Sequence, residues 1–254
     1  MDFVCFGVPP DDPEFRQGYW LQAYLMTMSA HRADPSSRIV FLTGPDVEVS
    51  KKIPFDAVER FAGDPAELMI WRTRAWIHHL ETTPAARTVF LDPDILVQRT
   101  PEGAFSGDFD IGFTWNQPRG AIEHRINSGV VFCPPGRRAA VFLARILDAM
   151  ADMSRDRRRW LGEQEAIARL LPAGTFDGVP PQQATVDGLT VRLLPCSEWN
   201  FFPTIGSFYG GPEPSPESFR AAPYGAPLVH FKGYRKNHML MYAQSVLGIE
   251  LPEG

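Results

Sequence analysis

The sequence predicts an α/β fold, with one mostly parallel central sheet flanked by helices and a smaller mixed β part in its second half. Short apolar runs alternate with helical patterns along the first half of the chain. Strands that alternate with helices are joined by right-handed crossovers and so become parallel neighbours. A chain of 254 residues with 44% hydrophobic residues can build one sizeable core, which favours a single domain over residues 1–254.

In the first half, each predicted helix follows a predicted strand. Two of the helices begin at a proline, Pro13 and Pro65, a residue that is favoured in the first turn of a helix. The last run ends in Asp-Pro-Asp, which interrupts the strand pattern. The elements expected here are a strand at 2–8, a helix at 14–31, a strand at 38–44, a helix at 65–82 and a strand-like run at 88–97.

The second half has a more mixed pattern. The segment 203–227 is rich in Pro, Gly and Ser and predicts a long surface loop, a type of segment that is often functional. The other elements expected here are strands at 109–115 and 128–133, helices at 137–153 and 162–171, a strand pair around 189–195, a strand at 227–231 and a final helix at 237–247.

Composition excludes several classes of protein. The net charge of -5 argues against general nucleic-acid binding. No run approaches the roughly 18–20 apolar residues that a membrane-spanning helix needs, and the start of the chain lacks the basic region of a signal peptide. Three cysteines are too few and too scattered for a disulfide scaffold. We therefore expect a cytoplasmic protein.

The central chemical signal is the carboxylate pair Asp92 and Asp94, which follows an apolar run. In an extended chain the residues i and i+2 point to the same face. Paired carboxylates favour a hard divalent cation such as Mn²⁺ or Mg²⁺. A rival pair, Asp108 and Asp110, stands at the start of a strand, whereas ligands of α/β sheets bind beyond the carboxyl ends of strands. A turn in which Asp caps backbone N–H groups is the structural alternative.

The second signal is the segment His230-Phe-Lys-Gly-Tyr-Arg-Lys236. A histidine at a strand end can supply a nitrogen to a metal, and Gly233 would let the backbone approach a ligand. The cationic side chains are suited to phosphates. A buried core histidine followed by a solvated basic turn is the alternative reading.

Together these motifs resemble the nucleotide-sugar-dependent glycosyltransferases of the GT-A (Rossmann-like) fold, and most closely glycosyltransferase family 8. The resemblance runs in order along most of the chain. The segments that carry it are Phe3 to Pro10, Trp71-Arg-Thr-Arg74, Leu91-Asp-Pro-Asp94, Asn127-Ser-Gly-Val130, Glu163-Gln164, Glu198-Trp-Asn200 and His230-Phe-Lys-Gly-Tyr-Arg-Lys236.

The resemblance implies a metal-dependent transfer of a sugar from a nucleoside-diphosphate sugar, expected to be UDP-linked, to a hydroxyl acceptor. Residues 1–97 would form the nucleotide-binding half and residues 98–254 the half that binds sugar and acceptor. The implied metal ligands are Asp92, Asp94 and His230. The implied donor-binding residues are Phe6, Gly7, Arg74, Asp92, Gly233 and Lys236, and the implied sugar contacts, which would include the catalytic residues, are Asn127, Glu163 and Gln164.

The chain departs from the family pattern at three places. Asn237-His238 replaces the usual Pro-Trp after the lysine, Glu163 replaces an Asp, and the segment after the first strand lacks the expected Thr-Asp. The family favours retention of the anomeric configuration. Glu163 leaves inversion open, because an inverting enzyme needs a carboxylate to take the acceptor proton.

Two other functions and the acceptor stay open at this point. A non-catalytic nucleotide- or carbohydrate-binding protein, or a sugar nucleotidyltransferase, could share the fold. The acceptor could be a lipid-linked glycan, a bacterial cell-surface polysaccharide precursor or a protein. The basic run Ser154 to Trp160 would suit peripheral contact with an anionic membrane, and a solvated helix end is the alternative.

Overall fold

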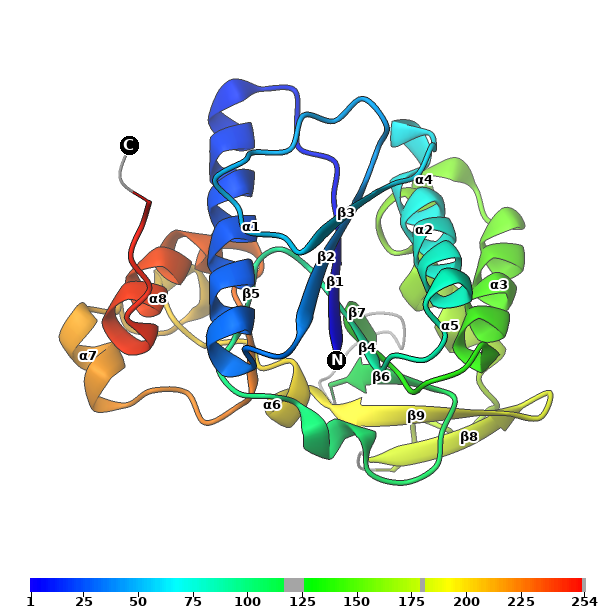
Figure 1. Cartoon of the computed structure of the whole chain (residues 1–254). Coiled ribbons are helices and arrows are strands. Elements are labelled where there is room, and N and C mark those ends of the chain that lie inside the picture. The colour runs from blue at the N-terminus through cyan, green and yellow to red at the C-terminus, as the bar shows by residue number, and fades with distance from the viewer. Residues whose placement is uncertain (117–125, 179–180, 253–254) are drawn as a thin grey trace.

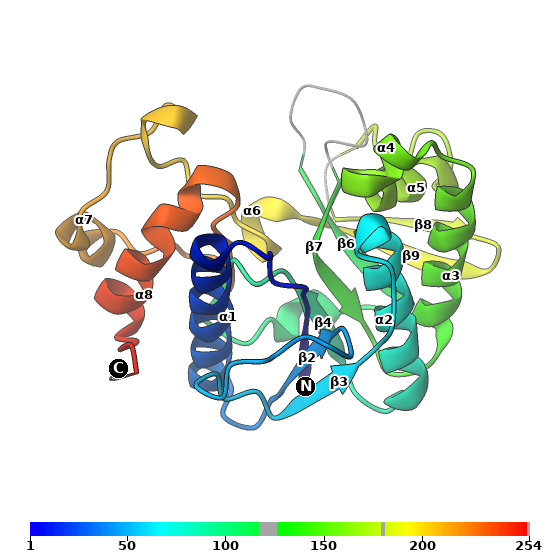
Figure 2. The ribbon, with the colours of Figure 1, turned by 90° about the horizontal axis from the view of Figure 1, so that it is seen from above.

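A computed structural model describes residues 1–116, 126–178 and 181–252 and confirms the predicted α/β class. A twisted central sheet is covered by helices on both faces (Figure 1). Seen from above, α2, α3 and α5 cover one face, while α1 and α8 lie on the other (Figure 2). None of the helices in these ranges combines the length and the apolar character needed to cross a bilayer.

Within the described residues, eight strands form the central sheet in the order β3-β2-β1-β4-β7-β6-β9-β8. β1 pairs in parallel with both β2 and β4, as the alternating pattern predicts. β7 runs antiparallel to β4 and β6, which makes the sheet mixed. The strands are β1 Asp2–Phe6, β2 Arg38–Thr43, β3 Ala57–Arg60, β4 Thr88–Leu91, β6 Ile111–Trp115, β7 Ile126–Cys133, β8 Gln182–Val186 and β9 Leu189–Pro195.

Two of the helical segments in the first half start at an aspartate that caps them. Asp12 accepts a hydrogen bond from the Glu14 N–H at the start of α1, and Asp64 caps the 3-10 turn Pro65–Glu67 that leads into α2. The helices are α1 Pro13–Ala33, α2 Leu68–Thr82, α3 Arg138–Ala151, α4 Arg155–Trp160, α5 Gly162–Leu170, α6 Cys196–Trp199, α7 Pro216–Ala221 and α8 Met239–Leu247.

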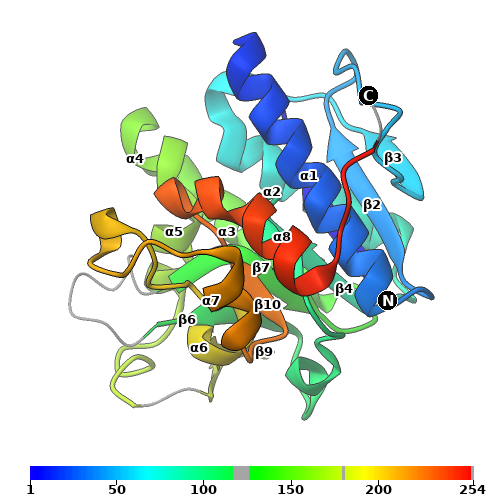
Figure 3. The ribbon, with the colours of Figure 1, turned by 90° about the vertical axis from the view of Figure 1, so that its left-hand side faces the viewer.

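The core lies on both faces of the sheet, because successive side chains of β1 and β4 point to opposite faces. Val4 and Phe90 pack under α2 and α3, while Phe3 and Val89 pack under α1. A third cluster joins α1 to α8 through Leu25 and other apolar residues. The two helices lie next to each other on this side of the molecule (Figure 3).

The predicted strand-like run 88–97 divides at Asp-Pro-Asp into two strands that belong to different sheets. β4 ends at Leu91 in the central sheet, and β5 (Ile95–Val97) pairs antiparallel with β10 (Leu228–His230) in a separate two-stranded sheet. Pro93 has no N–H to donate and lies in the break between them. This small sheet joins the middle of the sequence to its end.

The expected surface loop 203–227 is wrong for residues 216–221, which form α7. Ser215 and Ser218 make a reciprocal capping box at the start of this helix, and Pro216 occupies its first position. The buried Phe219 anchors it against Tyr242 of α8. The sequence analysis also missed β3, a short edge strand whose side chains are half-buried or exposed.

A polar cluster lies under α2, near the start of β1. The buried His79 places Nδ1 3.1 Å from Oε2 of Glu59 and Nε2 3.5 Å from Oδ2 of Asp2. Burial lowers the pKa of His79, but the two carboxylates outweigh this and raise the pKa above its ordinary value. The hydrogen bond from His79 in turn lowers the pKa of Glu59.

Candidate active site

Asp92 stands at the carboxyl end of β4, next to the start of β7. Its backbone N–H donates to the carbonyl of Gly129 at 2.9 Å, which extends the β4–β7 pairing by one residue. This bond places the Asp92 side chain at the edge of the sheet, where ligands of α/β proteins bind. The Asp-x-Asp pair therefore lies at the end of the strand that the sequence favours.

Backbone pairing also places His230 beside Asp94. In the small sheet His230 is opposite Ile95, and the N–H of Phe231 donates to the carbonyl of Asp94 at 2.8 Å. Both side chains are buried, and His230 Nε2 lies 3.1 Å from Oδ1 of Asp94.

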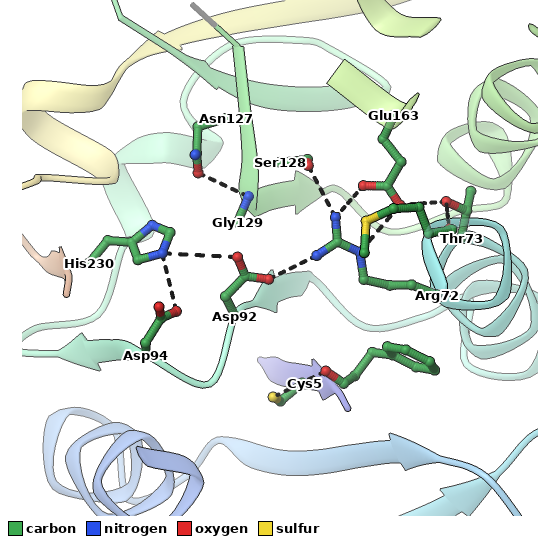
Figure 4. A network of polar contacts seen from close by, with 12 residues as sticks. Cys5, Arg72, Thr73, Asp92, Asp94, Asn127, Ser128, Gly129, Glu163 and His230 are labelled. Carbon is green, nitrogen blue, oxygen red and sulfur yellow. Dashed lines mark hydrogen bonds and ion pairs between the residues drawn. The ribbon is translucent and has the colours of Figure 1, made fainter. Parts of the chain in front are cut away.

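Three side chains from these segments form a candidate metal site (Figure 4). One ligand atom each from Asp92, Asp94 and His230 lies within 4.8 Å of the others, and no second group of this kind occurs in the described ranges. Two carboxylate oxygens and one imidazole nitrogen are a donor set that suits Mn²⁺ or Mg²⁺. The residues present therefore fit a divalent cation.

Asn200 fixes the orientation of the His230 ring. The Asn200 Nδ2 group donates to Thr114 Oγ1 at 2.8 Å and to Asn127 Oδ1 at 2.7 Å, so its Oδ1 is the atom that faces His230 Nδ1, at 2.9 Å. In the neutral form of the ring that a metal requires, this network places the proton on Nδ1 and leaves the lone pair of Nε2 available to a cation. Such a second hydrogen bond is usual for a histidine that binds a metal.

Gly129 lies in the middle of this arrangement. A Cβ built on it would lie 2.7 Å from Asp92 Oδ2, 2.7 Å from His230 Cε1 and 2.8 Å from Asn127 Oδ1. Any side chain at position 129 would therefore displace at least one of these groups. The glycine of the Asn-Ser-Gly segment provides the space that the carboxylate and the imidazole occupy.

The two aspartates differ in their electrostatics. Burial alone would raise the pKa of Asp94, but His230 and Lys236 outweigh it and hold the pKa well below its ordinary value. The Lys236 ammonium lies 3.2 Å from Asp94 Oδ2. Burial raises the pKa of Asp92; Arg72 counteracts this effect, while the charge of Asp94 adds to it. Asp94 is therefore the more firmly ionised ligand.

Arg72 connects Asp92 to Glu163. Its Nη1 donates to Asp92 Oδ1 at 2.9 Å, and its Nε and Nη2 donate to the two carboxylate oxygens of Glu163. Thr73 Oγ1 donates to Glu163 Oε1 at 2.6 Å, and Ser128 Oγ accepts from Arg72 Nη2 at 3.1 Å. Both carboxylate oxygens of the buried Glu163 thus bind residues of α2. Figure 4 shows these contacts beside the candidate metal site.

Asp92, Asp94 and His230 line a cavity of about 520 Å³. Of the site residues expected from the sequence, nine line it: Phe6, Gly7, Asp92, Asp94, Asn127, Gln164, His230, Gly233 and Lys236. Glu163 is not among the lining residues; its side chain is buried against Arg72. Arg74 has an exposed side chain and is not among the lining residues either. The structure brings Arg72, rather than Arg74, to the cavity.

The sequence analysis missed several lining residues. Tyr19 of α1 fills the space of the absent Gly7 side chain, since a Cβ on Gly7 would lie 1.3 Å from the Tyr19 hydroxyl oxygen. Burial raises the pKa of Tyr19. Lys232 was considered only as one of the cationic side chains of the motif that suit phosphates. The pairing of Arg72 with Glu163 had no local signal, because the two residues are far apart in sequence.

The rival pair Asp108 and Asp110 has a structural role in this chain. Asp110 accepts from Arg138 Nε at 2.6 Å and from the Thr190 N–H at 2.7 Å, which connects the β6 edge to α3 and β9. Asp108 is exposed. The basic run on α4 is also largely paired. Arg158 makes a two-bond contact with Glu67, and Arg157 lies 3.0 Å from Glu165.

Several solved structures share the fold of this chain. A glycosyltransferase involved in glycosylation of the major capsid of PBCV-1 matches with a TM-score of 0.54 and 14% identity, over 94% of this chain and 98% of that one. The galactosyltransferase LgtC, solved with donor and acceptor sugar analogs, matches with a TM-score of 0.54 and 13% identity, over 100% and 98%. The glycosyltransferase GlyE of Streptococcus pneumoniae TIGR4 matches with a TM-score of 0.55 and 12% identity, over 95% of this chain and 60% of that one.

These similarities define the class of fold. The protein has the GT-A fold that the sequence predicts, and the likeness extends over the whole chain. No protein-family model and no curated protein sequence matches the chain. At identities of 12–14% the solved structures define the fold alone, since one fold hosts many chemistries.

Proposed function

We propose that this protein is a metal-dependent glycosyltransferase that moves a sugar from a nucleoside-diphosphate sugar, expected to be UDP-linked, to a hydroxyl acceptor. The observation that carries the proposal is the convergence of Asp92, Asp94 and His230 at the mouth of a cavity, within 4.8 Å of one another. A divalent cation held there would stabilise the negative charge that builds on the departing diphosphate.

The protein's own residues then have defined tasks. Lys236, at the metal ligands, would bind a diphosphate oxygen with its ammonium. Arg72 holds Asp92 in place for the cation. Phe6 and Gly7, at the end of β1, would contact the nucleoside. Asn127 and Gln164 would contact the sugar, because both line the cavity beside the cluster.

Retention of configuration is the outcome that the geometry supports. An inverting enzyme needs a carboxylate free to take the acceptor proton. Both oxygens of Glu163 are bound to Arg72, and one also to Thr73. The other carboxylates among the lining residues are the two proposed metal ligands. NMR of the product tests this directly: an α-linked product from an α-linked donor is expected, and a β-linked product would refute retention.

The first experiment is calorimetric titration of UDP into the purified protein, in Mn²⁺ and then in EDTA. We expect binding that needs the metal and is lost in Asp94→Asn. Asp108→Asn is the matched control, since it changes the rival Asp-x-Asp and leaves the cavity intact. Equal UDP binding in EDTA and in Asp94→Asn would contradict the proposed metal site.

Incubation of the protein with a panel of UDP-sugars, with measurement of the UDP released, distinguishes the alternative functions. Release of UDP that requires the metal and an acceptor supports the glycosyltransferase proposal. Binding without turnover under any condition would favour a non-catalytic nucleotide- or carbohydrate-binding protein. Formation of a nucleotide sugar from a nucleoside triphosphate and a sugar phosphate would favour a sugar nucleotidyltransferase. The last outcome is unexpected, because the segment after β1 is acidic and proline-rich rather than a basic phosphate loop.

A further inference from the structure

Lys232 differs from the other cations of the cavity in having no carboxylate partner. Arg72 contacts Glu163 and Asp92, while Lys236 contacts Asp94. In the described part of the chain no ion pair or hydrogen bond involves the Lys232 ammonium, although this side chain lines the same cavity. The site therefore offers one ammonium group that no carboxylate of the described residues contacts.

The Lys232 ammonium rests on an aromatic ring. It lies 3.6 Å from the centroid of the Phe202 ring, which packs edge-on against the His230 ring at 5.4 Å. A cation–π contact of this kind positions the charge but uses none of its three N–H donors for a hydrogen bond to an oxygen. The Lys232 ammonium is thus held in place while its N–H groups stay available to a ligand.

The surrounding backbone orients this side chain. The Tyr209 hydroxyl donates to the Lys232 carbonyl at 3.4 Å, and Gly233 takes a left-handed conformation with φ of 63°. Arg235 of the same segment stacks on the Tyr209 ring at 3.4 Å and donates to the carbonyl of Pro203. Arg235 therefore supports the segment, and Lys232 is the residue left to face the cavity.

Lys232 and Lys236 differ in their contacts within the cavity. Lys236 lies 3.2 Å from Asp94, where a metal-bound diphosphate would lie. No contact joins the Lys232 ammonium to Asp92 or Asp94 among the described ion pairs, and its neighbour is Phe202. Of the two lysines of the motif, Lys236 is thus paired with a proposed metal ligand, whereas Lys232 contacts an aromatic ring.

We propose that Lys232 binds an anionic substituent, a carboxylate or a phosphate, on a sugar held in this cavity, in addition to the diphosphate. The inference rests on the proposed function and narrows its substrate class: either the transferred sugar or the acceptor sugar is acidic. Charge-assisted hydrogen bonds to such a group would discriminate strongly against the neutral sugar, because the ammonium would then stay unpaired.

The test compares three probe pairs by calorimetry with the Mn²⁺-loaded protein. UDP-glucuronate against UDP-glucose tests the donor. Methyl glucuronide against methyl glucoside, and glucose 6-phosphate against glucose, test the acceptor in the presence of UDP. Each pair is measured with the wild type, Lys232→Met and the control Lys52→Met, a lysine exposed on a turn outside the cavity.

We expect at least one acidic probe to bind ten-fold or more tightly than its neutral counterpart, with the preference abolished in Lys232→Met and kept in Lys52→Met. The pair that responds identifies whether donor or acceptor carries the charge. UDP itself should bind Lys232→Met within about two-fold of the wild type, while Lys236→Met should lose at least ten-fold.

Two results would overturn the inference. One is the absence of any acidic preference in all three pairs while UDP still binds, which would leave the proposed function standing. The other is a loss of UDP affinity in Lys232→Met equal to that in Lys236→Met, which would assign the ammonium to the diphosphate. Failure of UDP to bind the wild type at all would instead refute the proposed function, and this inference with it.

Discussion

Gly129 and Asp92 are so close that a Cβ on the glycine would lie 2.7 Å from a carboxylate oxygen of the aspartate. Gly129→Ala should therefore push Asp92 or His230 out of position. We expect Mn²⁺ affinity to fall at least ten-fold, with an unchanged far-ultraviolet circular dichroism spectrum. Gly18→Ala is the control, because a Cβ at that helical position meets nothing within 4 Å. Unaltered Mn²⁺ binding in Gly129→Ala would contradict this account of the site.

Asn200 should act through His230 as a positioning residue. Asn200→Ala removes the acceptor for the His230 Nδ1 proton, and loss of such a partner typically costs 10–100-fold in metal affinity. We expect a loss in this range, together with a change in the pH dependence of Mn²⁺ binding, because the ring loses its fixed tautomer. Asn200→Asp keeps the acceptor and should recover part of the affinity. Equal losses in both variants would point to a packing defect.

Glu163 should act on stability more than on proton transfer. Removing one partner of a buried ion pair costs about 3–5 kcal/mol, and in Glu163→Gln the amide retains part of the contact with Arg72 and Thr73. We expect the free energy of unfolding in urea to fall by about 2 kcal/mol or more. The pH profile of residual turnover should keep its wild-type shape. Normal stability together with loss of the acidic limb, the fall in turnover at low pH, would make Glu163 a general base.

The cluster of His79, Asp2 and Glu59 should make stability depend on pH in two directions. The folded state raises the pKa of His79, so this contribution is complete below about pH 6.5 and is lost as pH rises through the folded value. The folded state lowers the pKa of Glu59, so that contribution is complete above about pH 4.3 and is lost as pH falls. The cluster of His79, Asp2 and Glu59 therefore contributes most to the stability of the folded protein between about pH 4.3 and about pH 6.5.

Urea denaturation across pH 4–9 checks this expectation. The wild type should lose stability on going from pH 6 to the alkaline side of the His79 pKa, and His79→Gln should show a smaller loss. The matched control is His78→Gln, since His78 is an exposed neighbour on the same helix. Identical pH dependence in all three proteins would contradict the assignment.

The sequence could predict what short-range chemistry dictates. Proline starts and apolar runs marked the first strands and helices, and the crossover rule predicted that the strands are parallel, as β2, β1 and β4 are. The place of Asp92 beyond the end of β4 followed from the same reasoning. The structure brings together Asp92, Asp94 and His230, which the family resemblance assigned to one metal site.

Long-range pairings could not be predicted in this way. Arg72 was overlooked in favour of Arg74, because the face of α2 that meets the cavity depends on where Glu163 of α5 packs. The separation of β5 from β4 was also hidden, since the partner strand β10 lies far along the chain. Residues 216–221 were given to a loop because the prolines and serines that cap a short helix have the same composition as a loop.

The small sheet of β5 and β10 gives the site an order of assembly during synthesis. Asp92 and Asp94 leave the ribosome long before His230, which lies near the end of the sequence together with Lys232 and Lys236. N-terminal parts of a chain emerge first during synthesis, and β10, which carries His230, emerges after the other described strands. A nascent chain that ends before β10 has neither the imidazole nor the basic segment, so the proposed donor site cannot form until both have emerged.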